Sequence, residues 1–370
     1  MQVSDVKERV TSYDVAKRAG VSRSVVSAVL NNTPGIGYSE EKRKAVLKAI
    51  KELNYHVDAH ARGMRTGRSH CLAAYDNLGN KFFLQMLSGI KRACKEAGYH
   101  MLIYGSGSAE NDRDGLIELF LQRRIDGIIT KDSTSFSDAK WAEEIRSMGI
   151  PYISVEGYPE DDQVVSVLMD YEQSIRMALQ FLHDRELPPP VYVEIYTPPV
   201  YKPNWGDQRR RHAYEEWMKE RGLVPQIISR PHNKSERLDA WWLNWLGSQR
   251  LPVTVLANWS TGAREIYRAA YQLGLKIGVD VFVMAADNTE EVNEYLIPSL
   301  SAVEVPYMEM GQAAAERLLE YIRGDRDLSD TSKIYLQPRL AVRESTGTPK
   351  SPQYEKQKSD ASSEMERLRF

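Results

Sequence analysis

The chain has 370 residues, 42% hydrophobic and 27% charged, which is enough for two or three domains of a soluble globular protein. No run approaches the roughly 20 apolar residues of a membrane span, and the N-terminus lacks the apolar core of a signal peptide. The net charge of −2 divides into +6 over residues 1–70 and −8 over the remainder. The basic N-terminal segment is expected to bind a polyanion; the alternative is that it is only a solvated charged surface.

Three helical patterns fill the first sixty residues. The first begins at the cap candidates Thr11 and Ser12 and ends at Gly20, because glycine tolerates the left-handed turn that follows a helix. The second follows at once from Ser22, and the third begins at Ser39, each with apolar residues at helical spacing. Two short helices joined by a glycine turn and closed by a third predict a helix-turn-helix.

The polar face of the second helix favours DNA binding over the alternative of a generic three-helix bundle. Small and hydroxylated side chains let a helix lie close to the floor of the major groove, and an arginine can reach a base edge or a phosphate. With the valines of this helix buried, the residues expected on its N-terminal and outer face are Ser22, Arg23, Ser24, Ser27 and Ala28.

Residues 11–55 resemble the headpiece of the lactose-repressor family of bacterial transcription factors. The stretch TSYDVAKRAGVSRSVVSAVLNN contains the family's threonine, aromatic residue and Asp-Val-Ala, then Ala-Gly-Val-Ser, Val-Ser and Leu-Asn, in order and at family spacing. The resemblance implies a DNA-binding headpiece over residues 1–56. It implies DNA contacts from Thr11, Ser12, Tyr13, Ser22, Arg23, Ser24, Ser27, Ala28 and Asn31.

Two departures from the family pattern concern operator specificity. The family often has threonine in place of Val25 and arginine in place of Ala28. Loss of that arginine removes a guanine contact, whereas an alanine can touch a thymine methyl group. The operator should therefore differ from the commonest family sequence at that base.

Residues 57–69 contain the stretch AHARGMRTGRS, although a flexible basic tether gains nothing from a methionine. In the lactose-repressor family this segment forms a short hinge helix when two copies meet on DNA, and an apolar residue wedges into the minor groove. Counted from ELNY, Met64 occupies the wedge position, and Ala61 and Arg62 are expected to contact DNA with it. An internal glycine, and Val-Asp at 57–58 in place of Pro-Asn, predict a hinge helix that forms only in the DNA-bound dimer.

From residue 70 to 346, apolar runs alternate with amphipathic helical patterns, which is typical of βαβ units and parallel sheets. Two sequential α/β halves with a cleft between them resemble the periplasmic-binding-protein-type body that the family places after its headpiece. Strands are expected at 71–75, 100–105, 126–132, 151–157, 190–196, 226–230, 253–258 and 281–287, and helices at 81–99, 113–125, 171–187, 211–223 and 261–275.

Ligands of such bodies lie between the halves, at loops that follow the carboxyl ends of strands. The resemblance implies an aromatic pair in the cleft at Phe82 and Phe83, an acidic residue near the hinge at Asp170 and a ligand-gripping arginine at Arg210. It also implies that Asp287 accepts hydrogen bonds from a sugar or a base. The expected effector contacts are Phe82, Phe83, Lys131, Glu156, Asp170, Arg210, Trp259 and Asp287.

Trp259 is the clearest departure in the body, because the family often has Asn-Asp where this chain has Asn-Trp. A flat apolar face favours stacking against a sugar ring, so a sugar is the expected effector. Three alternatives stay open. Asp170 only caps the helix that follows it, an arginine of 209–211 other than Arg210 faces the ligand, or one of Phe82 and Phe83 belongs to the core and does not contact the ligand.

No catalytic motif is present in the sequence. The glycines of YGSGSAEN lack the spacing of a phosphate-binding loop or a dinucleotide fold, and no G-x-S-x-G elbow occurs. The histidines have no metal-ligand spacing, and the two cysteines form no C-x-x-C pair. We therefore expect a non-enzyme without cofactor or metal, in a reducing cytoplasm where the cysteines only pack.

The polar, proline-containing tail, residues 347–370, is expected to be disordered. It lacks the leucine heptads that some family members use for tetramerisation, so we expect a homodimer on a pseudo-palindromic operator.

The predicted fold is an all-α helix-turn-helix headpiece, a hinge helix and a two-subdomain α/β body. The predicted function is transcriptional regulation, by a repressor whose operator affinity is controlled by a sugar in the cleft. A sugar-binding protein without DNA regulation, or an α/β enzyme, are the alternatives.

We predict that Met64→Ala weakens operator binding and leaves ligand affinity unchanged, because an apolar wedge unstacks a base step away from the cleft. A mobility-shift assay on an operator fragment measures the first effect and ligand titration the second. Unchanged operator affinity would make the segment a plain linker.

Overall fold

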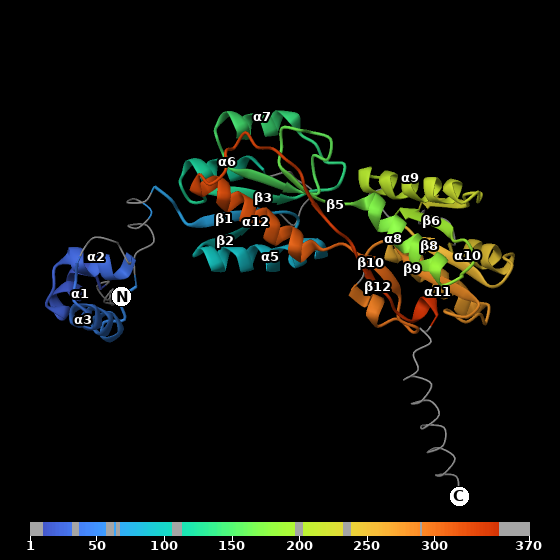
Figure 1. Cartoon of the computed structure of the whole chain (residues 1–370), viewed down its shortest axis with the longest axis horizontal. Coiled ribbons are helices and arrows are strands. Elements are labelled where there is room, and N and C mark those ends of the chain that lie inside the picture. Colours follow the sequence, from blue (N-terminus) through green and yellow to red (C-terminus); the bar gives the residue numbers. More distant parts are fainter. Residues whose placement is uncertain are drawn as a thin grey trace, which may run out of the picture. The chain divides into compact units, whose positions relative to one another are not determined.

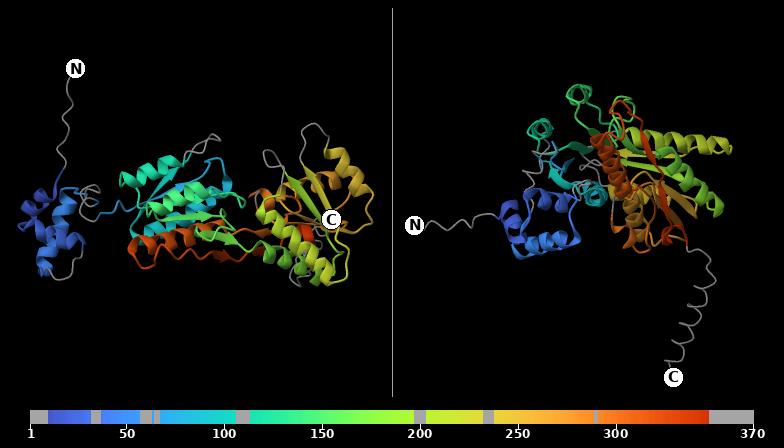
Figure 2. Two further views of the ribbon diagram at one scale, coloured as in Figure 1. Left: turned by 90° about the horizontal axis from the view of Figure 1, so that it is seen from above. Right: turned by 60° about the vertical axis from the view of Figure 1, so that its left-hand side comes forward.

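The computed structural model describes residues 10–31, 37–56, 63, 67–105, 113–196, 203–231, 238–288 and 291–347. The chain divides into two compact units between His70 and Cys71 (Figures 1 and 2). No helix within the described ranges is both long and apolar enough to cross a membrane. The DNA contacts expected at Ala61, Arg62 and Met64, and the tail from residue 348, lie outside the described residues.

The first unit contains the three predicted helices, α1 (Ser12–Ala19), α2 (Arg23–Asn31) and α3 (Glu40–Glu52). At the start of α1, Thr11 donates from its backbone nitrogen and its hydroxyl to the Asp14 carboxylate, at 2.8 and 2.7 Å. Ser39 accepts from the backbone nitrogen of Lys42 at 3.4 Å and so caps α3. The buried side chains of this unit, which pack the three helices together, include Val15, Ala16, Val26, Val46 and Ala49.

The second unit contains two six-stranded sheets. The first has the order β11-β5-β4-β3-β1-β2 with parallel pairing throughout, and the second has the order β12-β10-β9-β8-β6-β7 with only β12 antiparallel. The strands are β1 (Cys71–Tyr75), β2 (His100–Tyr104), β3 (Gly127–Lys131), β4 (Tyr152–Val155), β5 (Ser166–Met169), β6 (Val191–Tyr196), β7 (Ile227–Pro231), β8 (Val253–Ala257), β9 (Val281–Ala285), β10 (Ser301–Glu304), β11 (Ile334–Leu336) and β12 (Arg339–Ala341).

Helices flank both sheets, and strands and helices alternate along most of the chain (Figure 1). The helices are α5 (Lys81–Ala97), α6 (Asp114–Leu121), α7 (Ala139–Ser147), α8 (Tyr171–Asp184), α9 (Trp205–Glu220), α10 (Leu238–Gly247), α11 (Ser260–Gln272) and α12 (Tyr307–Arg323), with short 3-10 turns η1 (Glu291–Glu294) and η2 (Glu344–Thr346).

The two halves are not strictly sequential, which corrects the order expected from the strand pattern. After β5 the chain passes to the second half, where α8 packs beside α9, and after β10 it returns as α12, which lies against α5 (Figure 1). It passes a third time between β11 and β12. Apolar periodicity identifies a strand or a helix but does not reveal which sheet it joins, so these crossings could not be predicted from the pattern.

The contact between α5 and α12 is close because both helices have a glycine at the crossing. A Cβ atom on Gly89 would lie 1.8 Å from the Met308 carbonyl oxygen, and one on Gly311 would lie 2.2 Å from that of Met86. Larger residues would force the helices apart. This packing fixes the position of α12, whose first residue reaches the cleft between the halves.

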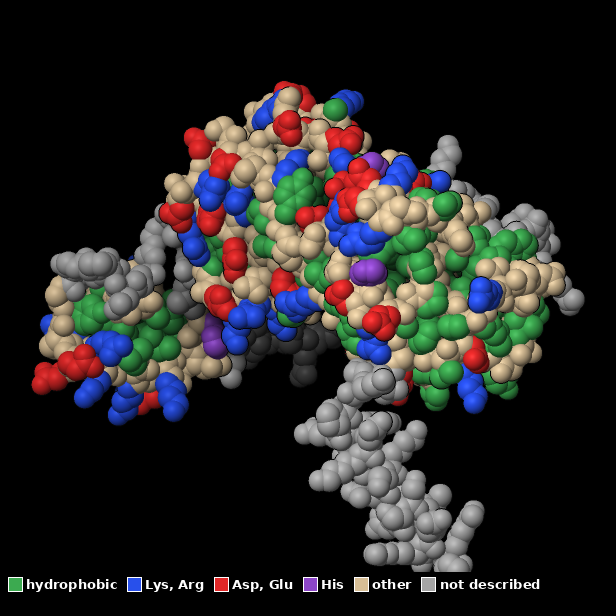
Figure 3. All heavy atoms as spheres, turned by 45° about the vertical axis from the view of Figure 1, so that its right-hand side comes forward, with side chains coloured by type: hydrophobic (Ala, Val, Ile, Leu, Met, Phe, Trp, Pro, Cys, Tyr) green, Lys and Arg blue, Asp and Glu red, His purple; other side chains and the backbone are tan. Residues whose placement is uncertain are grey.

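The outer surface of the body shows no single sign of charge on the face in Figure 3, where acidic and basic side chains are intermixed. One exposed pair joins α8 to α9, with Arg176 Nη2 lying 2.9 Å from Glu220 Oε1. Exposed pairs of this kind contribute little to stability.

Candidate functional site

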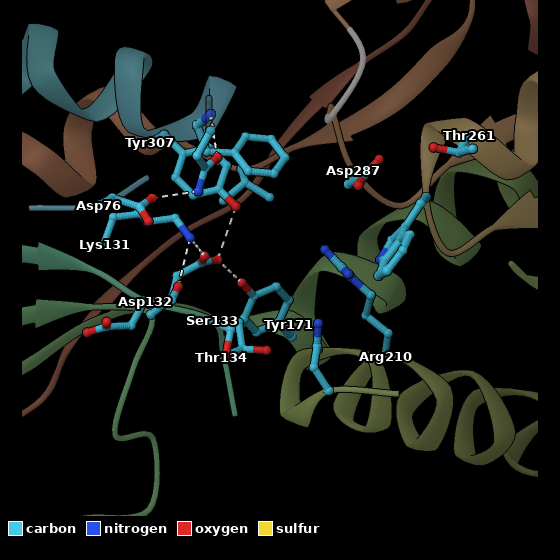
Figure 4. Close-up of a pocket in the computed structure, with 16 residues that line it drawn as sticks. Asp76, Lys131, Asp132, Ser133, Thr134, Tyr171, Arg210, Thr261, Asp287 and Tyr307 are labelled. Atoms are coloured by element: carbon cyan, nitrogen blue, oxygen red, sulfur yellow. Dashed lines mark hydrogen bonds and ion pairs between the residues drawn. The ribbon is translucent and has the colours of Figure 1, made fainter. Parts of the chain in front are cut away.

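A cavity of about 520 Å³ lies between the two halves of the body, where the carboxyl ends of both sets of parallel strands meet (Figure 4). This is the position at which open α/β folds bind ligands, and the volume falls in the range of about 300–1,000 Å³ usual for small-molecule sites. Of the residues predicted to contact an effector, those that line this cavity are Phe82, Lys131, Glu156, Arg210, Trp259 and Asp287.

The first wall is organised around Glu156, which is almost completely buried. Lys131 Nζ lies 2.6 Å from Glu156 Oε2, and the hydroxyl groups of Tyr171 and Tyr307 donate to Glu156 Oε1, the latter at 3.2 Å. Burial raises the pKa of both tyrosines well above the ordinary value, and the charge of Glu156 adds to this, so their hydroxyls remain protonated donors. Glu156 has a backbone φ of +72°, a conformation that is uncommon for a residue with a side chain.

Next to Lys131, Asp132 also lines the cavity and forms a second buried ion pair with Arg113. The hydroxyls of Thr130 and Ser154 each donate to Asp132 at 2.6 Å, and the Arg113 guanidinium carbon lies 4.1 Å from the centroid of the Phe136 ring. The Asp132 carboxylate is therefore compensated by groups on its own half of the body, and the charge needs no ligand to balance it.

An aromatic pair lies beside the Glu156 network. Phe82 and Tyr307 are stacked with ring centroids 4.4 Å apart, and Lys131 Nζ lies 5.5 Å from the Tyr307 centroid. Nearby, Asn80 donates to Asp76 at 2.6 Å, and burial raises the pKa of the Asp76 carboxyl group. This part of the wall combines apolar ring surface with polar groups at its edge.

The second wall is built from α9 and the loop before α11. Arg210 Nη1 lies 3.3 Å from Asp207 Oδ1, and the indole nitrogen of Trp259 donates to the same oxygen at 3.1 Å. Burial raises the pKa of Asp207, an effect that Arg210 opposes. The bond to Asp207 fixes the orientation of the Trp259 ring, which lines the cavity.

Arg210 also connects the two walls, because its guanidinium carbon lies 4.7 Å from the centroid of the Tyr171 ring. Among the described residues, its Nε atom has no hydrogen-bond partner although the side chain is buried. A buried donor without a partner is costly, and one beside a cavity is suited to bind an acceptor on a ligand.

Asp287 follows β9 and lies above Arg210 in the cavity (Figure 4). Its Oδ1 atom accepts from the backbone nitrogen of Ser260 at 2.8 Å and from the Ser260 hydroxyl at 2.9 Å. These bonds attach Asp287 to the first turn of α11, so its carboxylate has a fixed position in the cleft.

Two of the predicted effector contacts, Phe83 and Asp170, do not line this cavity, in agreement with the alternatives left open for them. Phe83 is 0% exposed and packs in the core of the first half, because neighbouring residues of a helix point about 100° apart and only Phe82 can face the cleft. Asp170 does not line the cavity, and instead caps α8 by accepting from the backbone nitrogen of Gln173 at 2.9 Å.

Several cavity residues were not predicted. Asp76 and Asp132 follow β1 and β3, so the same rule that selected Lys131 and Glu156 could have found them. Tyr171 and Tyr307 gave no such signal, because each begins a helix directly after the chain has passed between the halves.

The headpiece presents most of the residues predicted to contact DNA. Tyr13 is 61% exposed, and Ser22, Arg23 and Ser24 at the start of α2 are exposed. Thr11 is exposed and engaged with Asp14, Ser12 and Ser27 are partly buried, and the side chain of Asn31 lies outside the described residues.

Ala28 does not lie on the exposed face of α2, contrary to the prediction. Its side chain is only 1% exposed. A thymine-methyl contact by Ala28 is therefore not available in this arrangement.

No metal centre was found within the described ranges, where no three His, Cys, Asp or Glu side chains come together to hold an ion. Cys71 and Cys94 are both free thiols, and burial raises the pKa of Cys94 to about 11. A thiol with so high a pKa is a poor nucleophile at neutral pH.

Comparison with known families matches both units. Residues 11–58 match the family of bacterial regulatory proteins of the lacI type, and residues 172–346 match the periplasmic binding protein-like domain. The two matches occur in the order headpiece and then body.

Similar proteins extend over nearly the whole chain. The HTH-type transcriptional repressor PurR of Vibrio campbellii is 26% identical over 337 residues, covering 90% of this chain and 97% of its own length. The catabolite control protein A of Priestia megaterium is 25% identical over 342 residues, covering 91% and 99%.

Solved structures share the fold. The lac repressor dimer bound to operator and the anti-inducer ONPF has a TM-score of 0.69 at 21% identity, covering 92% of this chain and 100% of that one. A complex of the transcriptional regulator CelR with cellobiose has a TM-score of 0.59 at 22% identity, covering 91% and 100%.

The different positions of Phe82 and Phe83 generate a prediction. Phe83→Ala should lower the free energy of unfolding by about 3–5 kcal/mol because it empties a core site, whereas Phe82→Ala should cost only about 1–2 kcal/mol through lost stacking on Tyr307. Urea unfolding of the two full-length variants measures the difference. Equal losses, or a larger loss for Phe82→Ala, would contradict the assignment of Phe83 to the core.

Proposed function

We propose that the chain is a regulatory protein of the lacI type, a sequence-specific DNA-binding transcriptional regulator that acts as a repressor. The observation that carries the proposal is a lacI-type headpiece followed by a periplasmic-binding-protein-like body with a polar cavity. Catalysis has no part in this proposal.

The headpiece, residues 1–56, is proposed to read the operator through α2. Exposed Arg23 and the neighbouring serines at its N-terminus are suited to a major groove, where arginine recognises guanine and hydroxyls contact bases or phosphates. Residues 57–69 are proposed as the hinge helix, with Met64 as the wedge.

Residues 70–346 are proposed to bind an effector and to form a homodimer. One short recognition helix reads too few bases for useful specificity, whereas a two-fold dimer reads two half-sites. The effector would bind between the halves and shift the population between operator-competent and operator-incompetent arrangements.

We propose a neutral sugar as the effector, because the cations of the cavity are already compensated. Lys131 is paired with Glu156, and Arg210 with Asp207. Asp76 and Asp287 add further carboxylates to the lining, so a phosphorylated ligand would meet an excess of acidic groups. Hydroxyl groups can donate to carboxylates and accept from arginine, and the Trp259 face can cover a sugar ring.

DNA recognition is tested first. Arg23→Ala should weaken binding to the promoter region of the protein's own gene by roughly 5- to 150-fold, the loss expected for one good base or phosphate contact. Fluorescence anisotropy at one fixed salt concentration measures the change, since such affinities depend strongly on salt. Arg250→Ala, which removes the same charge from an exposed site on the body, is the control and should bind normally.

Wild-type protein that shows no sequence preference at near-physiological salt would overturn the regulator proposal. Ligand binding by such a protein would then favour the alternative, a sugar-binding protein without a role on DNA.

The effector class is tested by thermal shift with glucose, ribose, cellobiose, glucose 6-phosphate and hypoxanthine. A neutral sugar should raise the melting temperature by mass action, and glucose 6-phosphate should not. Asp287→Asn should abolish the shift, because an amide loses charge-assisted acceptance of hydroxyl donors but can still cap α11.

The matched control for this experiment is Asp325→Asn, an exposed carboxylate remote from the cavity lining, which should keep the full shift. A shift with glucose 6-phosphate or hypoxanthine alone would contradict the neutral-sugar proposal.

A further inference from the structure

The N-terminus of α9 is bound by groups from the other half of the body. The first backbone nitrogens of any helix lack partners within the helix. Here Asn204 caps the helix by accepting from the backbone nitrogen of Asp207 at 2.8 Å. The remaining nitrogens of the first turn, those of Trp205 and Gly206, point to the loop that follows β3.

Two hydroxyls in that loop accept these donors. The backbone nitrogen of Trp205 donates to Ser135 Oγ at 2.7 Å, and that of Gly206 donates to Thr134 Oγ1 at 3.2 Å. Thr134 and Ser135 belong to the first half of the body and α9 to the second, so both bonds cross the cleft. If the halves moved apart, water would replace both hydroxyls.

The approach of the two halves at this point is also close in its packing. Tyr171 begins α8, but its side chain packs in the core of the first half. A Cβ atom on Gly206 would lie 3.1 Å from Cζ of this ring, tighter than ordinary contacts. The Trp205 ring meets the same tyrosine edge-on, with centroids 6.0 Å apart. The first turn of α9 therefore fits against the first wall only when it has no bulky side chain at residue 206.

These bonds determine where the ligand-facing part of α9 lies. Arg210 is one turn beyond Gly206, and its guanidinium covers the Tyr171 ring that Glu156 holds. Release of the α9 N-terminus would carry Arg210 away from Tyr171 and enlarge the gap between the two walls. Thr134 lines the cavity, whereas Ser135 does not, so Ser135 can influence binding only through this arrangement.

We propose that Thr134 and Ser135 are positioning residues, which together hold the two halves in the arrangement that binds the effector. This inference rests on the proposed function, in that the cavity is the effector site. The hydroxyls favour the closed arrangement over an open one, and the measured affinity for a ligand depends on the fraction of molecules that is closed.

We call the two hydrogen bonds that the hydroxyls of Ser135 and Thr134 accept from the first turn of α9 the latch. Hydrogen exchange tests the latch directly and needs no ligand. In full-length protein carrying Thr134→Val and Ser135→Ala together, the amides of Trp205 and Gly206 should exchange roughly tenfold faster than in wild type, because two modest hydrogen bonds are lost. Mass spectrometry of peptides spanning residues 203–212 measures the rate. Ser137→Ala, an exposed serine of the same loop, is the control and should leave the rate unchanged.

Conservative variants separate the hydroxyls from general packing. Thr134→Ser and Ser135→Thr keep the acceptor oxygen and should restore slow exchange at residues 205 and 206. Equal exchange in wild type and the double variant would overturn the latch, and so would faster exchange throughout the body that the conservative variants fail to rescue.

Ligand affinity gives the second readout, with the sugar that raises the wild-type melting temperature in the panel above. Ser135→Ala alone, which leaves the cavity lining unchanged, should bind this sugar roughly 2- to 12-fold more weakly, because one modest hydrogen bond that favours the closed arrangement is lost. Faster exchange with unchanged sugar affinity would mean that the hydroxyls only cap α9, and would overturn the positioning role. If no sugar in the panel binds wild type, the neutral-sugar proposal fails, and the exchange rates alone decide whether the latch exists.

Discussion

The arrangement of the cleft depends on one buried carboxylate. Glu156, in an uncommon backbone conformation just after β4, binds Lys131 at the end of β3 and the hydroxyls of Tyr171 and Tyr307. Those tyrosines begin α8 and α12, the helices that the chain enters directly after two of its three passages between the halves. One side chain therefore fixes two of the three connections to the first sheet. Any change in the angle between the halves has to occur about the first residues of α8 and α12, whose hydroxyls are bound to Glu156.

The same network limits the ligands that the cleft can accept. Removing charges from water is costly, and replacing a buried ion pair by apolar residues often leaves stability unchanged or improves it, so the pairs Lys131–Glu156 and Arg113–Asp132 are not explained by stability alone. Their effect is to keep polar atoms at fixed positions around the cavity while cancelling much of its charge. A neutral molecule with many hydroxyl groups can use such atoms, whereas an anionic ligand would meet the further carboxylates of Asp76 and Asp287.

The sequence predicted the parts of the site that depend on local pattern. Lys131, Glu156 and Asp287 could be placed because the carboxyl ends of parallel strands meet at one edge, and Gly20 and Ser39 correctly marked helix ends. The sequence leaves open which of Phe82 and Phe83 packs in the core, and the helical period of α5 assigns Phe83 to it. The burial of Ala28 could not be predicted, because exposure of a small side chain depends on neighbours that the pattern does not reveal. Tyr171 and Tyr307 were missed since their meeting at Glu156 follows from the crossings between halves, a property of topology and not of spacing.

The strength of the contacts between the halves is suited to a reversible response. The two hydroxyl–amide bonds at the start of α9 exchange with water on opening and are worth about 0.5–1.5 kcal/mol each, and the Arg210–Tyr171 contact contributes about 0.5–2 kcal/mol. Their sum is of the same order as the few kcal/mol that separate populated conformations of a protein. A ligand that bridges both walls needs roughly 5.5 kcal/mol of preference for the closed arrangement to convert one nearly pure population into the other. Charged groups in place of Thr134 and Ser135 would bind the α9 N-terminus more strongly, and would close the cleft without waiting for a ligand. With hydroxyls at these positions, the fraction of molecules in the closed arrangement depends on whether a ligand fills the cavity.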